Sequence, residues 1–116
     1  MANKAALKIV DNPSASPPRP LGKHGLNLWR TIMAEYQIDD SGGCEMLAQA
    51  CAALDRAEEC AAAIRAKGVI ILTEHGPKDH PALKHELQNR AFVVRTLSRL
   101  GLDVEAIKPI GRPPGR

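Results

Sequence analysis

The chain has 116 residues and a formal net charge of +3, and 44% of its residues are apolar but only 3% aromatic. This length fits one domain, and heavy use of alanine, the strongest helix former, favours a mainly α fold over a β-sandwich or barrel. Since no apolar run approaches the roughly 20 residues that a helix needs to cross a bilayer, we expect no membrane partner.

Positive charge is concentrated at the two ends of the chain. Residues 1–24 hold four basic residues and one acidic residue, and residues 106–116 hold three basic residues and no acidic one. Residues 25–105 hold nine basic and twelve acidic residues. Basic arms on a folded body can follow a phosphate backbone, although solvated, solubilising termini would have the same composition. The predicted DNA contacts are Lys4, Lys8, Arg19, Lys23, Arg30, Lys108, Arg112 and Arg116.

Proline and glycine mark the limits of one domain. Four prolines between residues 11 and 22 make a helix implausible, so residues 1–23 are interpreted as a flexible basic arm. Residues 24–102 are expected to form a single helical domain. Residues 103–116 end in a run rich in proline and glycine, which predicts an extended basic tail.

Hydrophobic spacing predicts three helices inside this domain. The first covers residues 24–37 with Trp29 on its apolar arc, and the second covers residues 43–67 after a capping turn that contains Asp40. Alanines in the second helix permit close approach by another helix. The third helix follows His80-Pro81, stops at Gly101 and packs on the long second helix.

One β-type run separates the second and third helices. Residues 69–73 read Val-Ile-Ile-Leu-Thr and predict a strand, and residues 74–79 predict a turn. A lone strand cannot satisfy its own backbone groups. Its partner is therefore either a second short strand or a neighbouring subunit.

Two residues break the pattern of the third helix. Its predicted main apolar stripe is Leu83, Leu87, Ala91, Val94 and Leu97, and it is widened by Val93 and Leu100. Arg90 falls within this stripe and needs a partner, which Glu86 can provide one turn earlier. Phe92 lies on the opposite, polar face among cationic side chains. Such a ring can be a subunit contact, a stacking surface or a ring lying flat under arginines.

The cysteines and histidines do not indicate a catalytic or metal site. Cys44, Cys51 and Cys60 fall in one predicted helix, where their spacing is poor for a disulfide, and we interpret them as small buried hydrophobes. The histidine spacing matches no common zinc pattern. The chain also lacks nucleotide-binding glycine loops. We therefore predict no metal, no cofactor and no enzymatic activity.

The order of these features resembles the phage terminase small subunit family, in particular the short branch found in tailed phages and prophages. The similarity extends from about Leu7 to Arg116. It rests on Leu28-Trp29, Asp40, Gly68, His80-Pro81, Leu100-Gly101-Leu102 and Gly111-Arg112-Pro113-Pro114-Gly115.

The resemblance implies a non-catalytic role in viral genome packaging in the cytoplasm of the bacterial host. Family members bind double-stranded viral DNA, assemble into homo-oligomeric rings, and recruit and regulate a large subunit that holds the ATPase and nuclease. Ring assembly would use Arg90, Phe92 and Arg99 as oligomerisation residues.

Two other functions fit parts of the sequence. The first two helices, joined by residues 37–42, could form a helix-turn-helix of a small transcription regulator. However, the second of these helices starts acidic and is rich in alanine, which is poor for reading base edges. A metal-dependent hydrolase using cysteine and histidine would require a bound metal in the purified protein.

Overall fold

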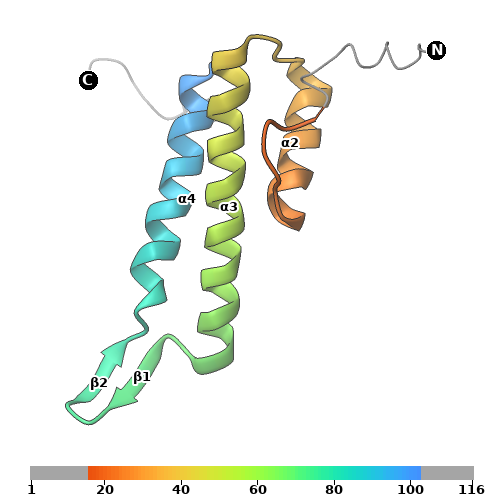
Figure 1. The fold of residues 1–116 in the computed structure, drawn as a ribbon. Helices are drawn as coiled ribbons and strands as arrows, with labels where there is room; N and C mark the ends of the chain where they lie inside the picture. Colours follow the sequence, from red (N-terminus) through yellow and green to blue (C-terminus); the bar gives the residue numbers. More distant parts are fainter. Residues whose placement is uncertain (1–15, 103–116) are drawn as a thin grey trace, which may run out of the picture.

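The computed structural model describes residues 16–102. In that part of the chain, three helices and one hairpin follow in the order α2 (Lys23–Tyr36), α3 (Ser41–Lys67), β1 (Ile70–Thr73), β2 (Gly76–Asp79) and α4 (Ala82–Arg99). The long helix α3 lies between α2 and α4, and the hairpin projects from one end of the helical layer (Figure 1). The predicted mainly α fold, with α3 packed on α4, is confirmed.

The N-terminal half of α3 carries the main hydrophobic core. Trp29 and Ile32 of α2 pack there against three residues of α3 and against Leu102, which follows α4. The residues from α3 are Leu47, Ala48 and Cys51. At 1.5 Å per residue the 27 residues of α3 span about 40 Å, whereas the 14 residues of α2 span about 21 Å. Helix α2 therefore covers only part of α3 (Figure 1).

Alanines allow α3 to be buried on a second side as well. Ala50, Ala53, Ala57 and Ile64 are buried in addition to the core residues, and α3 contacts both other helices. A small side chain lets a neighbouring helix approach closely without leaving a void. The alanine-rich composition is thus the reason that one helix can serve as the centre of the layer.

Local capping groups set the ends of the helices. The Asp40 carboxylate accepts a hydrogen bond of 2.7 Å from the Gly43 backbone N–H, so α3 begins at Ser41, two residues before its predicted start. At the end of α4, Gly101 has φ of 79°. The N–H groups of Gly101 and Leu102 donate to Ser98 and Leu97, which is a Schellman motif. This turn brings Leu102 back over the core.

The buried face of α4 differs in part from the predicted one. Val93 and Thr96 are buried, whereas Leu87 and Val94 of the predicted stripe are each 59% exposed. The prediction was wrong for Leu87 and Val94 because it assigned the inward face by hydrophobicity alone, whereas Val93, which was predicted to widen the stripe, is buried and Leu97 packs against the core. Arg90 pairs with Glu58 on α3 as well as with Glu86 on its own helix. A charged residue can therefore face α3 at the contact between the two helices.

The segment between α3 and α4 is a two-stranded antiparallel hairpin. Ile70 pairs with Asp79 and Thr73 with Gly76, so residues predicted as a turn provide the second strand. This answers the question of what pairs with β1. The turn itself is shorter than predicted, and Gly76 has φ of 108°, which glycine adopts without strain.

Residues 1–15 of the predicted arm and all of the predicted tail lie outside the described residues. Of the predicted DNA contacts, Lys4, Lys8, Lys108, Arg112 and Arg116 fall there. Between residues 16 and 102, no helix combines the length and the apolar character that crossing a membrane requires.

Candidate nucleic-acid interface

The outward surface of α2 carries a cationic face, formed by Lys23, Asn27 and Arg30. These residues follow one another at steps of four and three, so they lie on one side of the helix, and all three are exposed. With His24 and Leu26 they line a surface hollow. A row of two cations and an amide suits contact with phosphate oxygens.

The cationic face is not neutralised by the rest of the described chain. Within residues 16–102, Lys23 and Arg30 form no ion pair with any carboxylate. The first acidic residue of α2 is Glu35, near its other end. Two of the predicted DNA contacts therefore lie together and are available to a ligand, whereas Asn27 was not predicted.

The first turn of α2 is capped by a carboxylate from another helix. Gly22 occupies the N-cap position and provides no side chain, and instead the Asp55 carboxylate of α3 accepts two backbone hydrogen bonds. The donors are the N–H groups of Gly22, at 2.7 Å, and Gly25, at 2.8 Å. Because the Asp55 carboxylate already occupies the positive N-terminal end of α2, an anion that binds α2 must be held by the side chains of that helix.

Close packing at this cap depends on glycine. A Cβ atom at Gly25 would lie 2.3 Å from Asp55 Oδ2 and 2.6 Å from the Cys51 carbonyl oxygen. A Cβ atom at Gly22 would lie 2.9 Å from Asp55 Oδ1. Sequence reasoning missed Asp55 and both glycines. The only signal was a pair of glycines around a predicted helix start.

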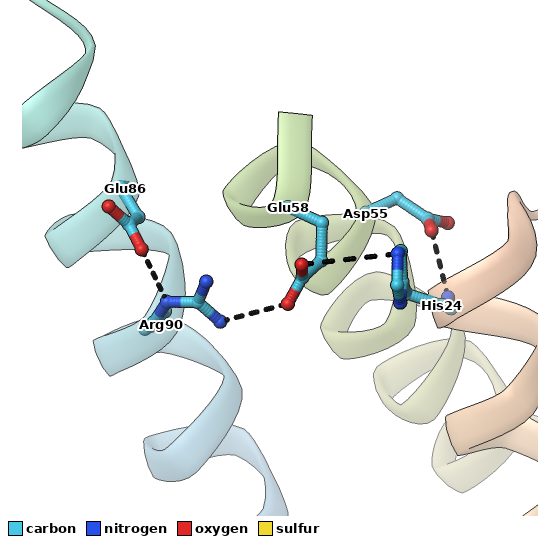
Figure 2. A network of polar contacts seen from close by, with 6 residues as sticks. His24, Asp55, Glu58, Glu86 and Arg90 are labelled. Carbon is cyan, nitrogen blue, oxygen red and sulfur yellow. Dashed lines mark hydrogen bonds and ion pairs between the residues drawn. The ribbon is translucent and has the colours of Figure 1, made fainter. Parts of the chain in front are cut away.

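A chain of charged residues joins α4 to α3 and reaches α2. Arg90 Nε donates to Glu86 at 2.8 Å, and Arg90 Nη1 donates to Glu58 of α3 at 3.3 Å (Figure 2). His24 Nε2 of α2 lies 3.9 Å from the same Glu58 carboxylate. Hydrogen bonding to Glu86, and to a lesser extent to Glu58, raises the pKa of Arg90. The predicted pairing of Arg90 with Glu86 is confirmed, and the contact with Glu58 was not foreseen.

Arg19 holds the chain that precedes α2 against α3. Its Nη2 donates to both carboxylate oxygens of Glu45, each at 2.8 Å. The pKa of Glu45 is lowered, chiefly by a hydrogen bond from Gln49 and also by the charge of Arg19. Arg19 was predicted to contact DNA, and the structure places it apart from the α2 cationic face with a carboxylate partner already bound.

The predicted oligomerisation residues of α4 have different surroundings. Arg90 is half-buried in the network just described, and Arg99 is exposed in the last turn of the helix. Phe92 is half-buried and adjoins buried Val93, so it is not the fully exposed ring that the sequence suggested.

Cys44 and Cys51 are poorly suited to nucleophilic or metal chemistry. Burial raises the pKa of Cys51 to about 12, with a smaller contribution from Asp55, so this thiol stays protonated at neutral pH. Burial also raises the pKa of Cys44. Among residues 16–102, no three His, Cys, Asp or Glu side chains come together in a group that could hold a metal ion.

Comparison with known proteins identifies the family. A family model described as "phage terminase, small subunit" matches residues 26–115. The chain belongs to this family. No curated protein and no solved structure gave a match. The matched range includes Arg30 and the three helices from Leu26 onward, and it continues through Lys108 and Arg112.

Membership in the phage terminase small subunit family gives the chain a role in phage packaging. Members are generally non-catalytic DNA-binding proteins whose partners are DNA and a large subunit, and they act in the host cytoplasm. The helix-turn-helix alternative is not favoured. Its recognition helix would be α3, which lies between α2 and α4 and is in contact with both.

Proposed function

We propose that this chain is the DNA-recognition and adaptor subunit of a viral packaging motor. It binds double-stranded viral DNA, assembles into a homo-oligomeric ring and regulates the large ATPase and nuclease subunit without catalysing a reaction itself. The observation that supports DNA contact in the described part of the chain is the α2 cationic face. Lys23 and Arg30 are exposed there, on one side of one helix and without carboxylate partners between residues 16 and 102.

A ring strengthens such a modest contact. Two cations per subunit give weak binding alone, because the electrostatic contribution scales with the number of phosphates neutralised. Several identical faces acting on one duplex raise the effective concentration at each later contact. We therefore expect DNA binding that is steeply salt-dependent and that weakens when the ring dissociates into subunits.

The test replaces both cations of the α2 cationic face. In a Lys23→Gln, Arg30→Gln variant, the slope of log affinity against log salt should fall by about 0.9 for each lost phosphate contact per subunit. Fluorescence anisotropy with a labelled duplex over a salt series measures this slope. The matched control is Arg65→Gln, Lys67→Gln, which removes the same charge from exposed positions in the last turn of α3. Equal slopes for the two double variants would contradict the proposed DNA face.

The C-terminal tail is a second proposed DNA contact. Deleting residues 106–116 removes Lys108, Arg112 and Arg116, so at most about three contacts per subunit should disappear from the salt slope. If the tail instead docks on the large subunit, truncation leaves the slope unchanged and abolishes large-subunit binding. Measuring both quantities on the same truncated protein separates the two roles.

Assembly is proposed to involve Arg90, Phe92 and Arg99 of α4. Arg90 would act by holding α4 against α3 through Glu58, since its guanidinium is engaged there within one chain. Phe92 and Arg99 would contact a neighbouring subunit directly.

A further inference from the structure

The hairpin presents an apolar face that nothing in the described chain covers. Ile70 and Leu72 of β1 alternate with half-buried residues and are 56% and 82% exposed. Their cross-strand partners are Asp79 and Pro77, so these four side chains share one side of the hairpin. We name Ile70, Leu72 and Pro77 the hairpin face. Leu72 is the most exposed large hydrophobic side chain between residues 16 and 102.

A second apolar surface runs along α4, where Leu87 and Val94 are each 59% exposed and Leu83 is half-buried. Leu83, Leu87 and Val94 follow one another at steps of four and seven and so lie on one side of the helix, away from buried Val93 and Thr96. We name these three residues the α4 strip. Near the start of the helix, Leu83, Leu87 and Pro81 line a surface hollow. Asp79, His80, Lys84, His85 and Gln88 complete the lining of this hollow, and its three apolar residues offer contacts for one aliphatic side chain.

We propose that the hairpin face of one subunit docks on the α4 strip of the next, with Leu72 entering the hollow lined by Leu83 and Leu87. This inference rests on the proposed ring and specifies which surfaces form it. The occupant is a second copy of this chain because the chain itself carries both halves of the contact. A partner of different sequence would require only one of them.

Charge on the two surfaces supports this pairing. The hairpin tip bears Glu74, whose side chain is 86% exposed, and Asp79 lies on the same side as Ile70. Helix α4 exposes Lys84, Arg95 and Arg99, and its one acidic residue, Glu86, is bound by Arg90. Acidic residues on the docking side of the hairpin thus meet the cations of α4 around the apolar contact, while exposed Lys78 lies on the other side of the hairpin. This charge pattern favours binding of a hairpin to a helix over binding of two hairpins or two helices to each other.

Two different surfaces on one chain produce a head-to-tail contact. Such a heterologous contact repeats from subunit to subunit and closes into a ring if the rotation allows. The hairpin projects from the end of α3 that lies away from α2 (Figure 1). The contact therefore leaves the α2 cationic face of every subunit open to DNA.

The test uses two variants that each break one half of the contact. Leu72→Asp places a charge on the hairpin face, and Leu87→Asp places one on the α4 strip. Both positions are mostly exposed, so folding should be retained, which circular dichroism at 222 nm checks. In native mass spectrometry each variant alone should be monomeric under conditions where the wild-type chain forms its ring.

Mixing the two variants provides the decisive measurement. The intact hairpin face of Leu87→Asp can bind the intact α4 strip of Leu72→Asp, but the resulting pair has no second intact combination of these two surfaces, and we expect the contacts of Phe92 and Arg99 to be insufficient alone to extend it. The mixture should therefore stop at a heterodimer. Lys78→Gln, on the other side of the hairpin, changes the charge by the same amount and should assemble as the wild type does.

Other outcomes would contradict the ring, the contact between these two surfaces, or the choice of a second copy as the partner. If the wild-type chain is monomeric at micromolar concentration, the ring and this contact are both wrong. If the wild type assembles and either Asp variant assembles equally, the ring stands and this contact is wrong. If both variants are monomeric and their mixture also remains monomeric, the surfaces do not bind each other. Loss of large-subunit binding with unchanged assembly would assign them to that partner instead.

Discussion

Replacing Asp55 with alanine should detach the first turn of α2 from α3. The carboxylate accepts hydrogen bonds from Gly22 and Gly25, residues 33 and 30 positions earlier in the chain. A hydrogen bond to a charged group contributes roughly 1.5–3 kcal/mol, and loss of a helix N-cap costs about 0.5–2 kcal/mol. Because this site is partly exposed, water can replace some of the loss. We expect Asp55→Ala to lower the free energy of unfolding by about 2–3 kcal/mol.

Thermal unfolding followed by circular dichroism measures this loss. For a domain of this size, 1 kcal/mol corresponds to a shift of about 4–8 °C, so the melting temperature should fall by roughly 10–20 °C. Protein concentration must be held equal, since subunit association also stabilises the folded chain. Asp39→Ala is the matched control because Asp39 is exposed and makes no described hydrogen bond or ion pair. A melting temperature of Asp55→Ala within about 2 °C of this control would refute the reasoning.

Three further outcomes follow from the contacts described. Gly25→Ala should destabilise the chain strongly in unfolding experiments, whereas Gly42→Ala, whose Cβ would meet Asp40 at an ordinary 3.7 Å, should be neutral or stabilising. Because the folded-state pKa of Glu45 is lowered, its contribution is present above the ordinary carboxyl pKa and disappears as pH falls through the folded value. The melting temperatures of wild type and Glu45→Gln should therefore differ at pH 6 and converge toward pH 3. Phe92→Ala should reduce the oligomer mass in native mass spectrometry with little loss of helical signal, and a fully assembled variant would contradict that role.

Features set by neighbouring residues could be predicted from the sequence. The capping aspartate before α3, the glycine after it and Gly101 after α4 each act within one turn of the helix end. Helix bounds were therefore predicted to within about two residues. The strand at β1 was also predicted, because a run of β-branched and aliphatic residues needs no distant partner to be recognised.

Features set by distant partners could not be predicted. Hydrophobic periodicity predicted that Leu87 and Val94 face α3. The hydrogen bond from Arg90 to Glu58 of α3 instead allows a charged residue of α4 to face that helix. The cap of α2 is similar, since nothing near Gly22 reveals that a carboxylate 33 residues later will accept its N–H. Of the candidate site, the cations Lys23 and Arg30 were predicted, and the aspartate that holds their helix in place was not.

Asp55 also offers a test of whether the position of α2 matters for DNA binding. Asp55→Asn removes one negative charge close to Lys23, so electrostatics alone predicts tighter binding to a duplex. If the carboxylate instead acts by holding the first turn of α2 on α3, the loosened turn places Lys23 poorly and binding should weaken. Glu59→Gln makes the same charge change at an exposed position of α3 and should leave affinity equal or higher. Anisotropy titrations at one salt concentration compare the two variants with the wild type, below the melting temperature of each. Weaker binding by Asp55→Asn beside unchanged or tighter binding by Glu59→Gln supports positioning. Tighter binding by both variants would show that Asp55 influences DNA only through its charge.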